Sequence, residues 1–284
     1  MFLKIYDFQN IWDNGRVFKI YKGDSKSMKK AYVGIFALLL SLLMLAACGS
    51  DETSGESKDG ETYTVATDAN FQPFEYKNPE TGEMEGFDID LIKAIADEAG
   101  FNVEFETMEF DGLIASMQSG KFPIGIAGIS ITDERKETIS FSDSYYDSGL
   151  ILTVPEESDV QSINDVDGLK VGTRQGSTSE SYLNANTDAE VVAYPEIVTA
   201  YMNLEKDRLD AVLYDLPNVQ YYIKENAEGK LKTVGDVMEG QPYGIAFPKD
   251  SELVDPVNEA LATLKENGTY DEIYKKWFGT EPAE

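Results

Sequence analysis

The feature that most constrains the fold is an alternation of short apolar segments with amphipathic helical segments, which begins at Thr62. The apolar runs at residues 63–67, 101–105 and 122–131 are short enough to be buried strands. Helices are expected between them, and the first should end at Gly100, because glycine favours the left-handed turn that follows a helix. Strands that alternate with helices predict a mostly parallel sheet with right-handed crossovers.

The same alternation then occurs a second time. Three further strands, each with a helix after it, are expected at residues 170–173, 190–194 and 211–214. One more strand at 244–247 and helical residues 253–278 are too few for a third domain, so they should complete one of the first two units. The chain would then cross twice between two α/β lobes, near residues 146–150 and 239–243, with a ligand cleft between the lobes.

The predicted domain organisation follows from these two crossings. We expect residues 62–146 and 243–284 to form the first lobe and residues 147–242 to form the second. Residues 49–61 contain no apolar side chain and are rich in Gly, Ser and acids, which is typical of a flexible linker. Residues 48–61 are therefore interpreted as a tether in front of the folded part.

A targeting segment precedes this tether. Lys29 and Lys30 are followed by an uncharged, mostly apolar run over residues 31–47 and then by Cys48. A membrane anchor is the alternative, but this run is at the short limit for spanning a bilayer. A secretory signal peptide over residues 28–47 fits better. The tetrad L-A-A-C resembles the lipobox of bacterial lipoproteins, which implies cleavage before Cys48 and a lipid on its sulfur.

The residues before the signal peptide do not fit it. A signal peptide begins near the start of a precursor, yet 27 residues precede Met28. These residues show no apolar period that connects them to the rest of the chain. We interpret residues 1–27 as a non-native upstream extension and Met28 as the initiator.

Charge and missing residue types exclude several classes of function. The chain has 52 acidic and 24 basic residues, a formal net charge of −28, which argues against nucleic acid because nucleic-acid binding needs basic patches. It has no histidine, which excludes His-based catalysis, metal binding and pH switching. Cys48 is the single cysteine, so an internal disulfide and a Cys-based metal cluster are excluded as well. No cofactor and no metal are expected.

Polar residues follow the expected strands at the edge where open α/β sheets bind ligands. They are Asp68, Ser130, Arg135, Arg174, Thr178 and Asp215. Arg135 lies in the first turn of a helix that begins after Thr132, where the helix dipole disfavours a cation. It therefore either forms a surface ion pair, for example with Glu134, or binds a carboxylate.

The other polar residues also have structural alternatives. Asp68 and Asp215 are candidate helix caps, and Arg174 is a candidate solvated loop cation. Taken together, however, these groups suit a small zwitterion, with Arg135 and helix-start N–H groups on its carboxylate and Asp215 on its ammonium. Phe71 and Phe110 either form apolar walls of this site or belong to the core.

Long ordered runs of the sequence also match a known family. They are A-T-D, P-F-E, G-F-D-I-D-L, A-G-I-S-I-T-D-E-R-K, F-S-D-S-Y-Y, D-A-V-L-Y-D-L-P-N, Y-G-I-A-F-P-K and E-N-G-T-Y-D-E-I-Y-K-K-W-F-G-T-E-P. From Thr62 onward the chain resembles the bacterial extracellular solute-binding proteins of family 3, which serve polar amino-acid ABC importers, with the glutamine-binding members as the nearest match. The resemblance implies a two-lobed periplasmic-binding-protein-like α/β fold of type II with two crossover strands.

The resemblance assigns roles at the ligand's main chain. It implies that Arg135 binds the α-carboxylate, assisted by the backbone N–H groups of Ser130 and Thr178. The α-ammonium is expected to bind the Asp215 carboxylate, the Ser130 hydroxyl and the Gly128 carbonyl. Thr178 departs from the glutamine-binding pattern, which has glycine at that position.

The resemblance also assigns the ligand's side-chain pocket. Phe71 and Phe110 are expected to enclose the aliphatic part, and Asp68 to accept a hydrogen bond from a side-chain amide. Arg174 stands where the glutamine-binding members have lysine, and Tyr214 where they have histidine. An arginine in this pocket could favour a carboxylate, which leaves glutamate and aspartate open. Asp68 would repel such a ligand unless Arg174 neutralises it, so glutamine is preferred.

The sequence thus predicts a monomeric, lipid-anchored protein on the outer face of a Gram-positive cell membrane. It is expected to close its lobes on a polar L-amino acid and deliver this ligand to the permease subunits of an ABC importer. An enzyme on the same fold, such as a dehydratase of cyclic carboxylic acids, is an alternative that would need a general acid or base in the cleft. A sensor domain is another, and it would need a separate partner chain for its output.

Overall fold

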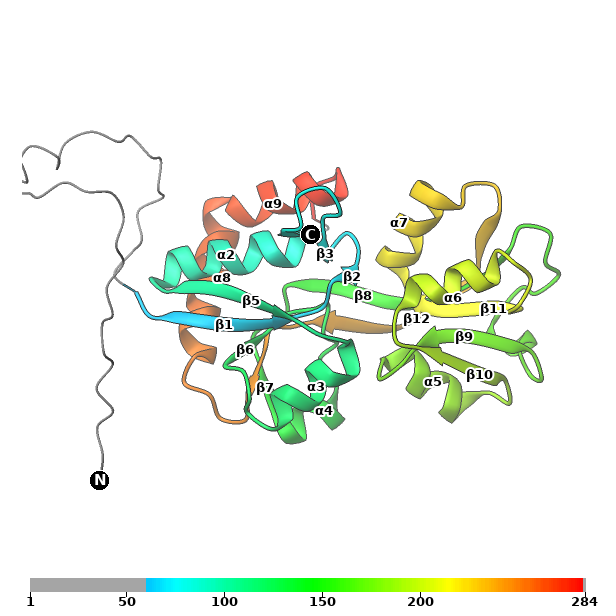
Figure 1. The fold of residues 1–284 in the computed structure, drawn as a ribbon, viewed down its shortest axis with the longest axis horizontal. Helices are drawn as coiled ribbons and strands as arrows, with labels where there is room; N and C mark the ends of the chain where they lie inside the picture. Colours follow the sequence, from blue (N-terminus) through cyan, green and yellow to red (C-terminus); the bar gives the residue numbers. More distant parts are fainter. Residues whose placement is uncertain (1–59, 283–284) are drawn as a thin grey trace, which may run out of the picture. The chain divides into compact units, whose positions relative to one another are not determined.

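The computed structural model describes residues 60–282. The expected upstream extension, the signal peptide, the lipid attachment at Cys48 and nearly all of the tether lie outside the described residues. Within residues 60–282 the chain forms two five-stranded sheets and one small three-stranded sheet (Figure 1). Among these residues, none of the helices has the length and apolar character needed to cross a membrane.

Lobe 1, as we use the term from here on, is built on the first five-stranded sheet. In order across the sheet, its strands are β5 (Asn102–Thr107), β1 (Thr62–Thr67), β6 (Ile124–Gly125), β13 (Ala246–Pro248) and β7 (Ile139–Phe141). β1 is parallel to β5 and to β6, as the alternation of strands and helices predicts. β13 is antiparallel to β6 and β7, so the carboxyl-terminal part of the chain returns to complete this sheet.

Helices cover both faces of the lobe 1 sheet (Figure 1). One face carries α2 (Phe87–Ala99), α8 (Val254–Asn267) and α9 (Thr269–Phe278), and the other carries α3 (Phe110–Gln118) and α4 (Asp133–Thr138). Successive residues of a strand point to opposite faces, so Val65 packs in the cluster with α2 and α8, whereas Ala66 packs with α3. α2 ends at Gly100 in the left-handed conformation (φ 82°), as expected.

Lobe 2 is built on the second five-stranded sheet. In order across the sheet, its strands are β10 (Glu190–Tyr194), β9 (Lys170–Arg174), β11 (Ala211–Asp215), β8 (Tyr146–Pro155) and β12 (Leu231–Tyr243). β9, β10 and β11 are parallel, and β8 and β12 are antiparallel additions at one edge. The short turn η1 (Ile163–Asp165) follows β8.

The helices of lobe 2 also lie on both faces of its sheet. They are α5 (Thr178–Asn186), α6 (Ile197–Leu204) and α7 (Leu216–Asn226). Ile151 and Val212 pack with α6 and α7, whereas Leu150 and Leu213 pack with α5 on the opposite face. This alternation is why the strands of lobe 2 are nearly continuous apolar runs, as parallel sheets covered on both faces require.

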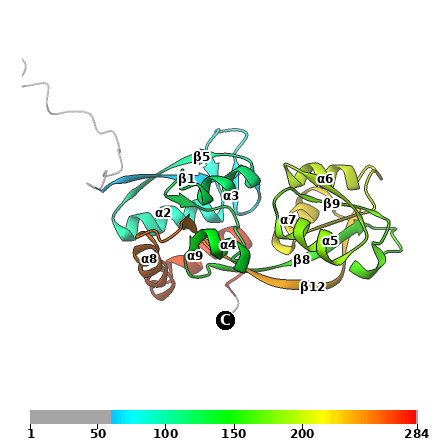
Figure 2. The same ribbon diagram turned by 90° about the horizontal axis from the view of Figure 1, so that it is seen from below.

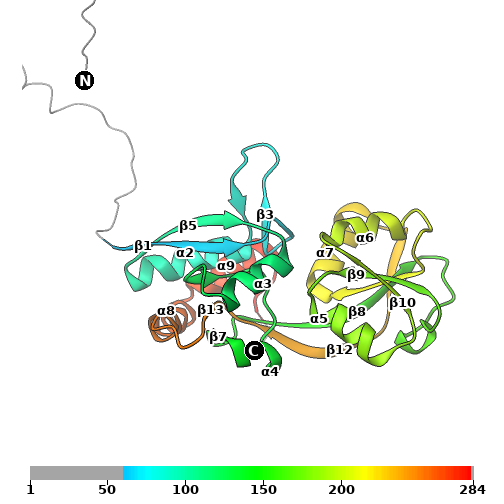
Figure 3. The same cartoon turned by 60° about the horizontal axis from the view of Figure 1, so that its bottom comes forward.

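β8 and β12 are the crossover strands, and they run side by side between the two sheets (Figures 2 and 3). At their lobe 1 end Tyr146 pairs with Tyr243, and the two rings stack with their centroids 5.7 Å apart. The Phe74 ring packs edge-on against Tyr146 at 4.9 Å and against Tyr243 at 5.4 Å. Aromatic packing therefore anchors both crossovers to lobe 1 at one place.

Two local expectations for lobe 1 are wrong. The sequence predicts a strand over residues 122–131, but β6 spans only Ile124–Gly125. The chain leaves the sheet because Gly128 adopts a left-handed conformation (φ 53°) and its amide bonds to the Asp88 side chain instead of a neighbouring strand. The sequence also gives no strand for the three-stranded sheet of β2 (Asn70–Phe71), β3 (Glu75–Lys77) and β4 (Met84–Glu85), because such short strands show no measurable period.

The packing of β8 leads to a stability prediction. Leu152 is fully buried between lobe 2 strands and α5. Leu152→Ala should lower the free energy of unfolding by about 2–5 kcal/mol, because the transfer energy of the removed carbons is lost and a cavity remains. Urea unfolding followed by circular dichroism measures this change. Met202→Ala, at a side chain that is 46% exposed, is the control and should change stability by less than about 0.5 kcal/mol.

Candidate functional site

The residues expected to form the site lie at the carboxyl ends of strands in both lobes. They are Asp68 after β1, Gly128 and Ser130 after β6, Arg174 at the end of β9, and Tyr214 and Asp215 at the end of β11. β1 is parallel to β6, and β9 is parallel to β11, so these ends gather at one edge of each sheet. A hydrogen bond from Arg135 of lobe 1 to Gly176 of lobe 2 and the ion pair between Asp68 and Arg174 show that the two edges face each other.

Arg135 is buried in α4 and reaches toward lobe 2. Thr132 caps this helix as expected, because its hydroxyl accepts from the Arg135 backbone N–H at 3.1 Å. The guanidinium donates to the Ser130 carbonyl at 3.0 Å and to the Gly176 carbonyl of lobe 2 at 3.1 Å. Arg135 is 8% exposed and forms no ion pair within residues 60–282, so the alternative of a surface pair with Glu134 is wrong. Burial lowers the pKa of Arg135 to about 10, which leaves it protonated at neutral pH.

Asp68 and Arg174 form a buried ion pair between the lobes. Asp68 is 1% and Arg174 2% exposed, and their carboxylate and guanidinium are in direct contact. Asp68 also accepts from the N–H groups of Ala69 and Asn70, and Arg174 donates to the Tyr214 hydroxyl at 3.2 Å. The pair therefore carries no net charge and is held on both sides by further hydrogen bonds.

Two aromatic side chains, Phe110 and Tyr214, contact Arg174 of this ion pair. The Phe110 ring lies beneath both guanidinium groups, 4.7 Å from that of Arg174 and 5.5 Å from that of Arg135. Such cation–π contacts are stronger in a desolvated site. Phe71, 1% exposed, packs edge-on against Tyr214 with 5.8 Å between centroids. Phe110 thus lies against both guanidinium groups and Phe71 lies against Tyr214, and both phenylalanines also belong to the core clusters.

Asp215 is a buried carboxylate beside the crossover. It is the N-cap residue of α7 but makes no cap hydrogen bond with its side chain; instead Oδ2 accepts from the Tyr243 hydroxyl of β12 at 2.7 Å. Burial raises the pKa of Asp215 to about 6, although Tyr243, Arg174 and Arg135 act in the opposite direction. At neutral pH Arg135 and Asp215 are therefore both charged, and the Asp68–Arg174 ion pair lies beside them.

A groove between the lobes reaches this site from one side. Its volume is about 610 Å³, and its lining includes Thr132 and Arg135 of lobe 1 and Gly176 and Thr178 of lobe 2. Thr178 is the first residue of α5, and Ser177 is its N-cap. The start of α5 therefore faces the same groove as the Arg135 side chain, where its backbone N–H groups favour an anion.

Further contacts between the lobes had no signal in the sequence. The Asn218 side chain donates to the Gln72 carbonyl at 2.7 Å, and the Gln175 side chain donates to Asp111 at 2.8 Å. Tyr243 was also missed, because it lies about thirty residues from the other groups of lobe 2 in sequence. The only sequence feature that could have indicated a role for Tyr243 in the site is its position in the expected crossover segment 239–243.

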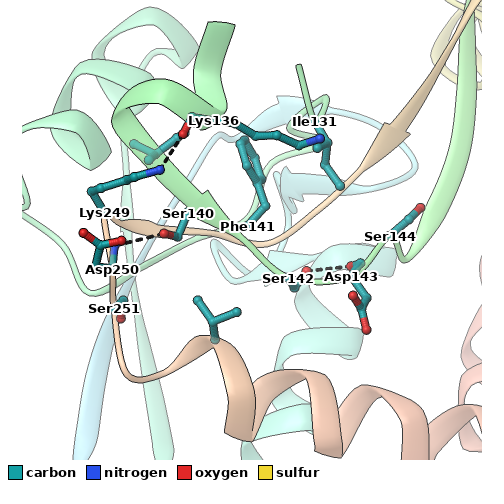
Figure 4. A pocket seen from close by; sticks show the side chains of 12 residues that line it. Ile131, Lys136, Ser140, Phe141, Ser142, Asp143, Ser144, Lys249, Asp250 and Ser251 are labelled. Carbon is teal, nitrogen blue, oxygen red and sulfur yellow. Dashed lines mark hydrogen bonds between the residues drawn. The ribbon is translucent and has the colours of Figure 1, made fainter. Parts of the chain in front are cut away.

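A larger groove of about 680 Å³ lies elsewhere on lobe 1 (Figure 4). Lys136, Ser140, Lys249 and Asp250 are among its lining residues, and none of the expected site residues is among them. Its polar groups bond to one another, since Lys249 donates to the Lys136 carbonyl and the Asp250 N–H donates to the Ser140 hydroxyl (Figure 4). Size alone therefore does not identify the functional site.

The buried ion pair leads to a prediction about coupling. Asp68→Asn and Arg174→Met should each lower stability, because each leaves a buried charge without its partner. The double variant should cost less than the sum of the single variants by about 1–3 kcal/mol, as measured by urea unfolding. The exposed pair Asp133–Lys136 is the matched control and should show no measurable coupling. If the effects of the two single variants simply add in the double variant for Asp68–Arg174, as they should for Asp133–Lys136, the buried ion pair is contradicted.

Comparison with known proteins agrees with this architecture. The model of the bacterial extracellular solute-binding proteins, family 3, matches residues 63–280. A probable histidine-binding protein of Neisseria gonorrhoeae is 34% identical over 254 residues, which are 86% of this chain and 94% of that protein. The ABC transporter glutamine-binding protein GlnH of Bacillus subtilis is 32% identical over 277 residues, which are 90% of this chain and 100% of that protein.

A solved structure shows the same fold. The arginine-, lysine-, histidine-binding protein ArtJ of Geobacillus stearothermophilus superposes with a TM-score of 0.75 at 37% identity, covering 78% of this chain and 97% of that one. The predicted two-lobed α/β fold of type II is thereby confirmed. The chain belongs to the bacterial extracellular solute-binding proteins of family 3.

Proposed function

We propose that this protein captures a polar L-amino acid with an uncharged side chain, most favourably glutamine, and delivers it to an ABC importer. The observation that carries this proposal is that lobe 1 buries the cation Arg135 and lobe 2 buries the carboxylate Asp215, with the Asp68–Arg174 ion pair beside them. A free amino acid has a carboxylate and an ammonium a few ångströms apart, and this arrangement offers one partner to each.

The ligand's main chain would bind across the lobes. Arg135 uses only part of its guanidinium on the Ser130 and Gly176 carbonyls, and its remaining N–H groups can donate to a carboxylate. Backbone N–H groups of Ser130 and Thr178 would assist. Asp215 would accept from the ammonium, together with the Ser130 hydroxyl and the Gly128 carbonyl. A ligand held by both lobes stabilises their contact, which is the physical basis of closure.

The ligand's side chain would meet Asp68 and Arg174. An amide has one donor and one acceptor group, so it can donate to Asp68 and accept from Arg174 without disturbing the charge balance of the pair. A ligand with a carboxylate side chain would be repelled by Asp68, and a ligand with a cationic side chain would be repelled by Arg174. Both repulsions are strong at short range in a buried site. The aliphatic carbons would pack against Phe71 and Phe110.

Relatives support the ligand class but differ in the side chain. Their names specify histidine, glutamine, or the set arginine, lysine and histidine. The side-chain argument above is therefore what favours glutamine in this chain. Glutamate or aspartate is the alternative, favoured by the presence of Arg174 in place of a lysine.

The location follows from the amino terminus, which is outside the described residues. We propose that a lipid on Cys48 anchors the monomeric mature protein to the outer face of a Gram-positive membrane. Residues 49–61, which are polar and acidic, would act as a tether that lets the folded part reach the permease. We assign no catalytic residue, because each buried carboxylate of the site already has a binding role.

Calorimetry against the twenty amino acids tests the proposal. The protein should first be unfolded and refolded to remove ligand carried over from expression, and glutamine should then bind most tightly. Arg135→Ala should weaken binding by about a hundredfold or more, because a bidentate carboxylate contact contributes roughly 1.5–3 kcal/mol per hydrogen bond.

The matched control is Lys136→Ala, which removes the neighbouring cation on the same helix. The Lys136 side chain is 56% exposed and points away from the site, so its removal should leave affinity within about twofold. Unchanged affinity in Arg135→Ala would refute the site. Tightest binding of glutamate or aspartate would keep the site and replace glutamine as the ligand.

The raised pKa of Asp215 predicts a pH dependence. The ammonium binds ionised Asp215, so affinity should be greatest above pH 6 and fall by up to about tenfold per pH unit below it. The ligand-free protein should respond in the opposite direction: a folded-state pKa of about 6 against 3.8 unfolded stabilises it as pH falls through this range. Titration calorimetry from pH 4.5 to 8 measures the first effect. Asp215→Asn should bind weakly at every pH and lose both dependences.

A further inference from the structure

Two carboxyl groups outside the ligand contacts are buried together behind Gly128. Glu75 lies in β3 opposite Phe71 of β2, and Asp88 is the second residue of α2. Both are 0% exposed. The proposed function uses neither of them, yet they lie next to a backbone segment that the ligand is expected to touch.

The hydrogen bonds of Asp88 lead directly to the site. Its Oδ2 accepts from the Gly128 N–H at 2.9 Å and from the Tyr145 hydroxyl at 2.8 Å. Gly128 is in the left-handed conformation, and a Cβ at this position would lie 2.4 Å from the Phe71 ring. The segment is therefore fixed from two sides, by the Phe71 ring and by the Asp88 carboxylate.

The remaining oxygens of the two carboxyl groups require a proton. Within residues 60–282, Asp88 Oδ1 and both oxygens of Glu75 receive no hydrogen bond from another donor, and neither residue forms an ion pair. The Asp88 backbone N–H donates at 2.8 Å to the carbonyl of Phe74, the residue before Glu75, and the negative charge of Asp88 raises the pKa of Glu75. Two carboxylates are both acceptors, so a hydrogen bond between them exists only when one carries a proton.

We propose that Glu75 and Asp88 share one proton and act as a single buried acceptor of charge −1 that positions Gly128 for the ligand. In this arrangement Glu75 is a positioning residue that acts through Asp88. The consequence for binding rests on the proposed function, in which Gly128 contacts the ligand. The sharing of the proton itself does not depend on any ligand.

The surroundings favour this assignment of the proton. Burial raises the pKa of Glu75 well above its ordinary value, and the charges of Asp88 and Asp215 raise it further. Tyr145 and Tyr214 also face Glu75 and stay protonated, because burial raises the pKa of each. Burial raises the pKa of Asp88 to about 6, although the hydrogen bonds from Gly128 and Tyr145 act in the opposite direction. Within residues 60–282 Asp88 accepts hydrogen bonds from Gly128 and Tyr145, whereas neither oxygen of Glu75 accepts one, so we place the proton on Glu75 and the charge on Asp88.

The pH dependence of stability tests the proton, with Glu75→Gln as the variant. Glutamine keeps a donor toward Asp88 and does not titrate. In the folded state Glu75 should keep its proton, whereas in the unfolded state it loses this proton above pH 4.5. The equilibrium constant for unfolding of the wild type, divided by that of Glu75→Gln, should therefore rise about tenfold per pH unit from pH 4.5 to 7. Denaturant unfolding of the ligand-free protein at several pH values measures this ratio.

The matched control is Glu83→Gln, the same chemical change at an exposed position just before β4. The unfolding constant of the wild type divided by that of Glu83→Gln should not change with pH. A constant ratio for Glu75→Gln as well would show that Glu75 is ionised in the folded protein, which would overturn the proposal. Since no ligand is present, this result is independent of whether the proposed function is correct.

Affinity tests the positioning role. With glutamine as the probe at pH 7, Glu75→Gln should bind within about threefold of the wild type, whereas Glu75→Leu, which fills similar space without a donor, should bind at least about tenfold more weakly. Equal affinity of the two variants would reduce Glu75 to a structural residue and overturn the role. If Glu75→Leu does not fold, Glu75→Gln decides alone: retained affinity supports the proposal and a tenfold loss overturns it.

Discussion

Burial of charge between the two lobes is the constraint on which the rest of the structure depends. Moving an ion out of water costs several kcal/mol even after the protein relaxes, so an unbalanced charge would keep the lobes apart. Here Asp68 and Arg174 neutralise each other; Asp68 also accepts from the N–H groups of Ala69 and Asn70, and Arg174 donates to the Tyr214 hydroxyl. Arg135 and Asp215 form no ion pair with each other or with another side chain within residues 60–282. A zwitterion would complete the balance.

The fold brings these charges together through the direction of its strands. Side chains at the carboxyl ends of parallel strands meet at one edge, and each lobe contributes such an edge. The paired crossovers β8 and β12 keep the two edges opposite each other, and Tyr243 joins this framework to the site through its hydrogen bond to Asp215. The crossover strands and the proposed ammonium site therefore share the Tyr243 side chain.

In the proposed function, recognition is divided between two sets of groups. Arg135 and Asp215 would bind the carboxylate and ammonium that every amino acid has, whereas Asp68, Arg174 and Tyr214 would face its side chain. Behind both sets, Glu75 and Asp88 have no cationic partner within the described residues, and sharing a proton limits their charge to one. The same physical rule, that buried charge must be balanced or removed, thus accounts for the ion pair, the proposed ligand and the shared proton.

The sequence by itself determined the α/β alternation, the helix stop at Gly100, the Thr132 cap and the residues at the strand ends, because these depend on local periodicity and on the conformational preferences of single residues. The tertiary structure alone decided that Arg174 pairs with Asp68, that Tyr243 bonds to Asp215, that β6 is short, and that Glu75 and Asp88 meet. The two residues in most of these contacts lie far apart in the chain. The free-energy cost of burying a charged group also depends on all of its neighbours in space, and a local sequence pattern carries no information about those neighbours.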